Sequence, residues 1–142
     1  MHGKRILAAL LGALSGLALP LPAVAHDPAR IPANVAPAIG GHFELTDQNG
    51  RRVRDSDLHG KVALVFFGFT HCPDVCPITA ASLARTLKLL GERADQVVPV
   101  FITVDPERDT PAILREYTQA FDPSFIGLSG DLAQTQKTAS DF

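Results

Sequence analysis

The fold is decided by residues 62–77, VALVFFGFTHCPDVCP, which join an apolar run to a motif with two cysteines. Residues 62–69 are almost all apolar and rich in β-branched and aromatic side chains, which is typical of a strand buried on both faces. Beyond Pro77, apolar residues recur at helical spacing as far as Leu90, and Gly91 follows as a stop signal. We therefore expect a central strand, a loop that carries the cysteines, and a helix.

The segments on both sides continue an alternation of strands and helices. Upstream, residues 42–59 predict a short hairpin with a turn at residues 47–50. Downstream we expect a second buried strand at residues 97–104 and a helix at residues 111–121 that is capped by Thr110. A short strand or loop at residues 125–128 and a weakly helical end at residues 131–142 follow. This order predicts an α/β fold with parallel strands and right-handed crossovers, in which chemistry lies at the carboxyl ends of the strands.

Cys72 and Cys76 lie at that end of the first buried strand, where a helix begins. A spacing of four residues at a helix start places both sulfurs on one face, with α-carbons about 6 Å apart, within the range of a disulfide. The free amides of a helix N-terminus lower the pKa of a thiol. Such a pair suits a soft metal such as Cu(I) or reversible oxidation, and a passive disulfide or two buried thiols is the structural alternative.

Composition limits the classes of function. The chain has 142 residues, two cysteines and a formal charge of −2, with 46% apolar and 20% charged residues. That length supports one domain, and the interspersed charges argue against a nucleic-acid partner. Two cysteines are too few for a disulfide framework.

The N-terminus has the pattern of an export signal. Lys4 and Arg5 precede an uncharged apolar run at residues 6–19, which is shorter than the roughly 20 residues that span a bilayer as a helix. The small residues of Ala23-Val24-Ala25 match a cleavage site. We expect a signal peptide at residues 1–25, or a retained anchor that tethers the chain to a membrane. An irregular arm at residues 26–41 and a domain at residues 42–142 would then lie in the periplasm or another exported, oxidising compartment.

Four stretches of the sequence form one recognisable set. The first two are GKVALVFFGFTHCPDVCPIT at residues 60–79 and VFITVDPERDTP at residues 100–111. The other two are FELTDQNG at residues 43–50 and FDPSFIGLSGD at residues 121–131. Together they resemble the Sco/SenC family of thioredoxin-like copper proteins.

The resemblance implies a thioredoxin-like fold, a central sheet flanked by helices with an inserted hairpin. It also implies that Cys72 and Cys76 bind copper, as Cu(I) or Cu(II), with one distal histidine, and form the redox-active pair. The implied role is assembly of the binuclear copper site of cytochrome c oxidase, with the subunit that carries this site, or another copper chaperone, as partner. Asp105 matches a family loop near the metal and is predicted to have a positioning role.

The chain departs from the family pattern after residues 127–130, because no histidine follows this match. The family's C-terminal strands and final helix are expected to be missing. A further hypothesis is therefore that the chain is a truncated product with impaired copper binding. Among the other histidines, His71 and the hairpin residues His42 and His59 are predicted to be ordinary surface residues. His26 would chelate Cu(II) with its own amino group if cleavage follows Ala25.

Two functional classes remain open on the sequence. A copper metallochaperone would use the cysteines as metal ligands. A thiol–disulfide oxidoreductase would use the same pair as a catalyst, although the general thioredoxin motif has two residues between its cysteines rather than three.

Overall fold

The computed structural model describes residues 40–142. The predicted signal peptide at residues 1–25 and the predicted arm up to residue 39 lie outside the described residues. Within the described part, no helix has the length and apolar character that crossing a bilayer requires.

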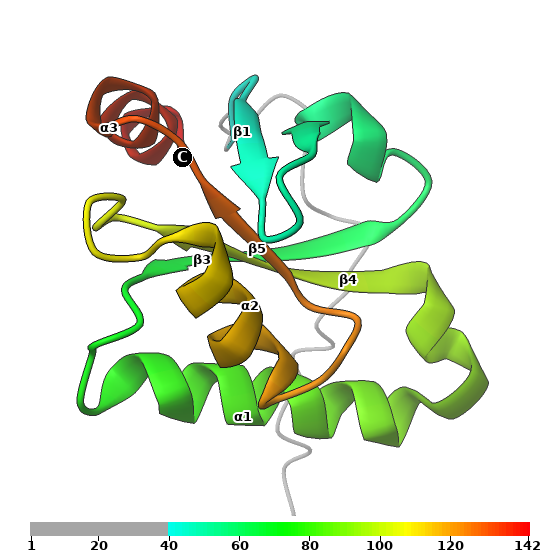
Figure 1. Cartoon of the computed structure of the whole chain (residues 1–142). Helices are drawn as coiled ribbons and strands as arrows, with labels where there is room; N and C mark the ends of the chain where they lie inside the picture. The colour runs from blue at the N-terminus through cyan, green and yellow to red at the C-terminus, as the bar shows by residue number, and fades with distance from the viewer. Residues whose placement is uncertain (1–39) are drawn as a thin grey trace, which may run out of the picture. The chain divides into compact units, whose positions relative to one another are not determined.

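The domain is built on one mixed sheet of five strands in the order β2-β1-β5-β4-β3 (Figure 1). The strands are β1 (Glu44–Asp47), β2 (Arg52–Arg54), β3 (Val62–Gly68), β4 (Val97–Thr103) and β5 (Ile126–Ser129). The pairs β3–β4 and β4–β5 are parallel, whereas β1 is antiparallel to both β2 and β5. The hairpin expected at residues 42–59 is therefore confirmed, and it extends the parallel part of the sheet.

The chain forms five helices in the described part. They are the 3-10 helices η2 (Asp55–Leu58) and η3 (Gly91–Gln96) and the α-helices α1 (Val75–Leu90), α2 (Pro111–Gln119) and α3 (Leu132–Asp141). Helix α1 connects the parallel strands β3 and β4, and α2 connects β4 and β5, as the alternating pattern predicts. The predicted cap of α2 is confirmed, because the side chain of Thr110 accepts a hydrogen bond from the Ile113 amide. Asp131 caps α3 in the same way, through the Gln134 amide at 2.7 Å.

The position predicted for the first apolar strand is wrong. Residues 62–69 were expected in the centre of the sheet, but β3 lies at its edge and β4 lies between β3 and β5. Among the described residues β3 pairs with β4 alone, so most of its side chains are only half-buried. An apolar run predicts that both faces of a strand are covered, but it does not say how many strands flank it.

The two faces of the sheet bury separate cores. Three alternate residues of β4, which are Val98, Val100 and Ile102, pack on one face in a cluster with residues of the hairpin. Phe101 points to the other face, where its ring packs against Phe66. That second face is covered by α1 and α2 (Figure 1). The carboxyl ends of β3 and β4 therefore meet the start of α1 and the loop before α2.

Candidate metal centre

The two cysteines lie on either side of the start of α1. Cys72 lies in the loop between β3 and α1, where its amide donates to the Phe69 carbonyl at 3.1 Å. Cys76 lies in the first turn of α1. Cys72 is partly exposed and Cys76 is buried, and both are free thiols. One thiol is thus accessible from solvent while the second lies beneath it.

The surroundings displace the two thiol pKa values in opposite directions. The pKa of Cys72 is lowered, first by the backbone amide of Asp74 and then by the side chain and backbone amide of Cys76. The pKa of Cys76 is raised, first by burial and then by its interaction with Cys72. Amides at a helix N-terminus favour a thiolate, whereas an apolar environment favours a thiol. Cys72 is therefore the more acidic thiol of the pair.

Gly68 makes room for the buried sulfur. A Cβ atom on this residue would lie 2.8 Å from Sγ of Cys76 and 2.9 Å from the ring of Phe101. The last residue of β3 must therefore lack a side chain for Cys76 to pack against the strand. Sequence reasoning did not single out Gly68, although a glycine that ends an apolar strand just before the cysteines is a visible signal.

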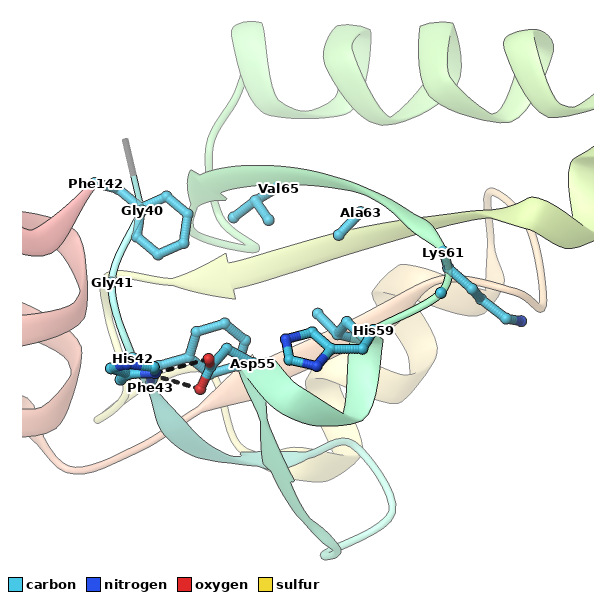
Figure 2. Close-up of a pocket in the computed structure, with 12 residues that line it drawn as sticks. Gly40, Gly41, His42, Phe43, Asp55, His59, Lys61, Ala63, Val65 and Phe142 are labelled. Carbon is cyan, nitrogen blue, oxygen red and sulfur yellow. Dashed lines mark hydrogen bonds and ion pairs between the residues drawn. The ribbon is translucent and has the colours of Figure 1, made fainter. Parts of the chain in front are cut away.

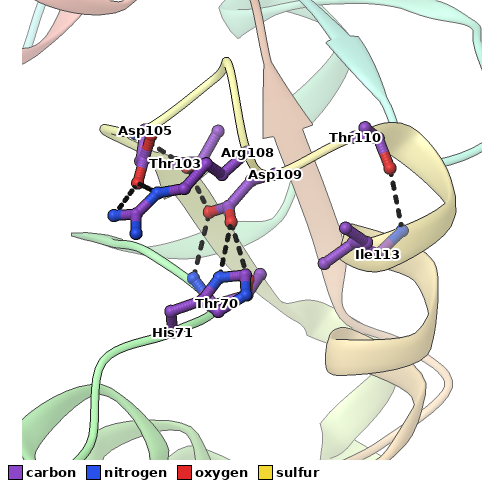
Figure 3. A network of polar contacts seen from close by, with 8 residues as sticks. All are labelled: Thr70, His71, Thr103, Asp105, Arg108, Asp109, Thr110 and Ile113. Atoms are coloured by element: carbon purple, nitrogen blue, oxygen red, sulfur yellow. Dashed lines mark hydrogen bonds and ion pairs between the residues drawn. The ribbon is translucent and has the colours of Figure 1, made fainter.

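Asp109 connects the cysteine loop to the loop after β4 (Figure 3). Its buried carboxylate accepts hydrogen bonds from the amide and hydroxyl of Thr70, at 3.0 and 2.6 Å, and from the hydroxyl of Thr103 at 2.5 Å. The Nδ1 atom of His71 lies 3.8 Å from the same carboxylate. The residues just before Cys72 are therefore held by one buried carboxylate from the loop between β4 and α2.

Asp105 has a more local role. Its carboxylate pairs with Arg108, with a hydrogen bond from Nε at 2.5 Å, and its amide donates to Thr103 at 3.0 Å. Neither contact involves the cysteine loop. The contact with that loop comes from Asp109 in the same matched stretch, a residue that the sequence analysis did not separate from its neighbours. The positioning role of Asp105 therefore stays a prediction.

Tyr117 of α2 is a further residue that sequence reasoning missed. Its hydroxyl is buried, and burial together with the charges of Cys76, Cys72 and Asp109 raises its pKa to about 12. It lines a cavity of about 370 Å³ together with Thr70 and other residues. A tyrosine in an amphipathic helix signals packing, and no local pattern indicates that its buried hydroxyl has no hydrogen-bond partner.

The described histidines do not join the cysteines. His42 is fully exposed and its Nδ1 lies 2.9 Å from Asp55, and His71 hydrogen bonds to Thr70 at 3.1 Å. Residues 40–142 contain no group of three or more histidine, cysteine, aspartate or glutamate side chains arranged to hold a metal. His26 lies outside the described residues. Within the described part, the candidate ligands are therefore the two thiols.

A separate cavity of about 590 Å³ lies on the hairpin side of the domain (Figure 2). It is lined by His42, Asp55 and His59 from the hairpin region, by Val65 of β3 and by Phe142. None of the residues from 66 to 77 lines it. The cysteine site is accordingly a surface junction rather than part of this cavity.

Comparisons with known proteins agree with this geometry. The chain is 44% identical over 104 residues to an SCO2-like protein of Rickettsia felis, covering 73% of this chain and 51% of the relative. The chain thus spans about half the length of the curated relatives it matches. A structure of Bradyrhizobium japonicum ScoI with copper bound is 53% identical, with a TM-score of 0.70, over 73% of this chain and 66% of that chain.

A more distant structure is that of BsSco, in which a disulfide switch was identified and which is described as a member of the Sco family of cytochrome c oxidase assembly proteins. It is 27% identical, with a TM-score of 0.61, over 71% of this chain and 61% of that chain. The predicted thioredoxin-like fold is confirmed by these structures and by the mixed sheet flanked by helices. A family model described as SCO1/SenC matches residues 32–142, and the chain therefore belongs to the SCO1/SenC family.

Proposed function

We propose that this chain is an exported copper metallochaperone that binds copper through Cys72 and Cys76 for the assembly of the binuclear copper site of cytochrome c oxidase. The observation that carries the proposal is the two free thiols at one strand–helix junction, with pKa values displaced in opposite directions. The copper-bound ScoI structure and the description of BsSco support it.

The chemistry of two thiolates suits Cu(I), which prefers soft sulfur ligands. Cys72, the thiol with the lowered pKa, lies on the accessible side and binds the incoming ion first. Cys76 then loses its proton to water as it binds, because a metal ligand must be deprotonated. The absence of a side chain at Gly68 leaves room for the sulfur of Cys76, and the carboxylate of Asp109 holds the loop before Cys72 through the amide of Thr70.

The location and partner belong to the same proposal. Residues 1–25 act as a signal peptide, cleaved or retained as an anchor, and residues 26–41 connect it to the domain at residues 42–142. The copper is passed to the oxidase subunit that carries the binuclear site, or exchanged with another copper chaperone. The accessible thiol of Cys72 is the side of the site from which a partner's sulfur ligand approaches.

A copper titration under reducing conditions tests the proposal. The wild-type chain is expected to bind one Cu(I) ion, and Cys72→Ser and Cys76→Ser are each expected to abolish tight binding. His59→Gln, which lies in the hairpin region, is the control for adventitious binding and retains the wild-type stoichiometry. Tight binding by a variant that lacks both thiols refutes the assignment. His26→Ala in the cleaved chain, titrated with Cu(II), separately tests chelation at the new N-terminus.

A second candidate function is thiol–disulfide exchange, favoured by the accessible, low-pKa Cys72 beside the buried Cys76. With glutathione disulfide as oxidant, the two thiols become one disulfide and two molecules of glutathione are released. The reduction potential against a glutathione buffer and turnover with a small dithiol measure this activity. A site that oxidises once but does not turn over points to the chaperone role.

A further inference from the structure

The cavity of about 370 Å³ beside α2 adjoins the cysteine loop. One of its walls is formed by Thr70 and His71, the two residues directly before Cys72. The other wall comes from α2 and the residue that follows it, and consists of Ile113, Glu116, Tyr117 and Ala120. Figure 3 shows part of both walls, with Thr70 and His71 on one segment and Ile113 on the other. The volume is within the range of ligand-binding cavities in proteins.

The wall on α2 is fixed and mostly apolar. The ring of Tyr117 is packed with centroids 5.2 Å from Phe101 and 5.1 Å from Phe121. Across the cavity, the hydroxyl of Thr70 is already used, because it donates to Asp109 at 2.6 Å and lies 3.1 Å from His71. An entering group therefore meets mainly apolar surface, and a large apolar group gains most by entering.

The charges around this cavity indicate what accompanies such a group. Glu116 is exposed and lines the cavity, and Asp74, between the two cysteines, is also exposed. Opposite charges across an interface steer association and select partners. At the start of α1, Val75 and Ile78 are 63% and 60% exposed and add apolar surface beside the loop. The surface around the accessible thiol thus suits a partner that is apolar at its centre and basic beside it.

We propose that this cavity receives a large apolar side chain that flanks the partner's cysteine, with a basic side chain next to it, when copper or a disulfide is exchanged at Cys72. This inference rests on the proposed exchange chemistry at Cys72. A side chain held in a cavity one residue away from the thiol keeps the partner's sulfur close, so that the exchange proceeds within one complex. Ile113 and Glu116 are then specificity-determining residues, which act on the choice of partner.

Short peptide disulfides with a 2-thiopyridyl leaving group test the inference. The thiolate of Cys72 attacks the peptide sulfur, a new disulfide forms, and 2-thiopyridone leaves with the electron pair and a proton from water. The probes are acetyl-Phe-Cys-Lys-amide and acetyl-Lys-Cys-Phe-amide, each compared with the peptide that has Ala in place of Phe. We expect at least one order of residues to react about tenfold faster with Phe than with Ala, because part of the ring is buried. Absorbance of the released thiopyridone gives the rates.

Two variants alter the cavity in opposite ways. Ile113→Ser makes its wall polar, and Ala120→Leu fills it, and each is expected to remove the preference for Phe. Leu132→Ser is the control, because Leu132 is an exposed apolar residue of α3 that does not line the cavity. All three should react with iodoacetamide at the wild-type rate, which shows that the cysteine loop is intact. Glu116→Gln should slow the Lys peptides about twofold at low salt.

The outcomes separate this inference from the proposed function. Equal rates for the Phe and Ala peptides in the wild-type chain overturn the inference, while the copper titration leaves the function standing. A preference for Phe that persists in both Ile113→Ser and Ala120→Leu also overturns it. If Ile113→Ser does not fold, Ala120→Leu decides alone. A chain that prefers Phe but binds no copper refutes the copper function and supports the cavity as a recognition site for thiol–disulfide exchange.

Discussion

At the scale of single residues, the difference between the two thiols follows from where each lies relative to the start of α1. Cys72 lies just outside the helix, where the amides of Asp74 and Cys76 are directed toward its sulfur and lower its pKa. Cys76 is inside the first turn and packed against β3, where burial raises its pKa. Two residues of the same type, four positions apart, therefore differ in acidity.

This difference predicts the order of alkylation. At pH 7 iodoacetamide is expected to modify Cys72 first, because the residue with the lowered pKa has the larger thiolate fraction. The rate at Cys72 should rise with pH through a midpoint below the ordinary cysteine value of about 8.5. The rate at Cys76 should rise only at higher pH. Peptide mapping by mass spectrometry measures both rates, and faster modification of Cys76 contradicts the assignment.

Gly68→Ala tests the packing of the buried sulfur. The added methyl group would lie 2.8 Å from Sγ of Cys76, so the helix start or the strand end must move. We expect a loss of about 1–3 kcal/mol in the free energy of unfolding and weaker copper binding. Gly127→Ala is the control, because Gly127 lies in β5 rather than in β3 and its Cβ would meet Thr118 of α2 at 3.0 Å. It should lower stability without changing the reactivity of the cysteines, as measured by denaturant unfolding and alkylation.

At the scale of elements, the loop before α1 and the loop before α2 are joined by one buried carboxylate. Asp109 satisfies three donors from Thr70 and Thr103, while Asp105 pairs with Arg108 on the surface. Both aspartates belong to the same predicted motif, but their burial differs. Asp109 has no exposed surface, whereas the side chain of Asp105 is 22% exposed.

Asp109→Ala and Asp105→Ala should therefore have unequal effects. Removing the Asp109 carboxylate leaves buried donors without an acceptor, which costs about 3 kcal/mol or more in the free energy of unfolding. Removing Asp105 breaks a surface ion pair worth about 0–1 kcal/mol. The loss of the Asp109 charge should also lower the pKa of Cys76, because that charge helps to raise it. Denaturant unfolding and the pH dependence of alkylation measure both effects, and equal losses in the two variants would show that burial does not distinguish them.

At the scale of the whole molecule, the candidate metal centre is assembled from the ends of adjacent parallel strands and the start of α1, which covers one face of the sheet (Figure 1). The strand ends bring residues 68–76 and 103–109 together, and Tyr117 of α2 packs against Phe101 on the same face of the sheet. The site is thus coupled to the tertiary fold rather than to the cysteine loop alone. A ligand that binds there stabilises the native state as a whole.

Copper should accordingly raise the melting temperature of the chain. Free Cu(I) at 100 times its dissociation constant contributes about 2.7 kcal/mol of apparent stability, provided that the unfolded chain does not bind it. The shift should disappear in Cys72→Ser and Cys76→Ser and persist in His59→Gln. Thermal unfolding followed by circular dichroism measures it, and an equal shift in the cysteine variants would indicate binding elsewhere.

Sequence periodicity and local chemistry determined the hairpin, the helices with their Thr110 and Asp131 ends, and the placement of Cys72 and Cys76 at a strand–helix junction. These features depend on residues close together in the chain, where side-chain spacing and capping groups act directly. Tertiary structure decided that β4 rather than β3 is central, and it placed Gly68 against Cys76. It likewise joined Asp109 to the cysteine loop and packed Tyr117 against Phe101, because strand order and contacts between distant segments depend on how separate elements pack.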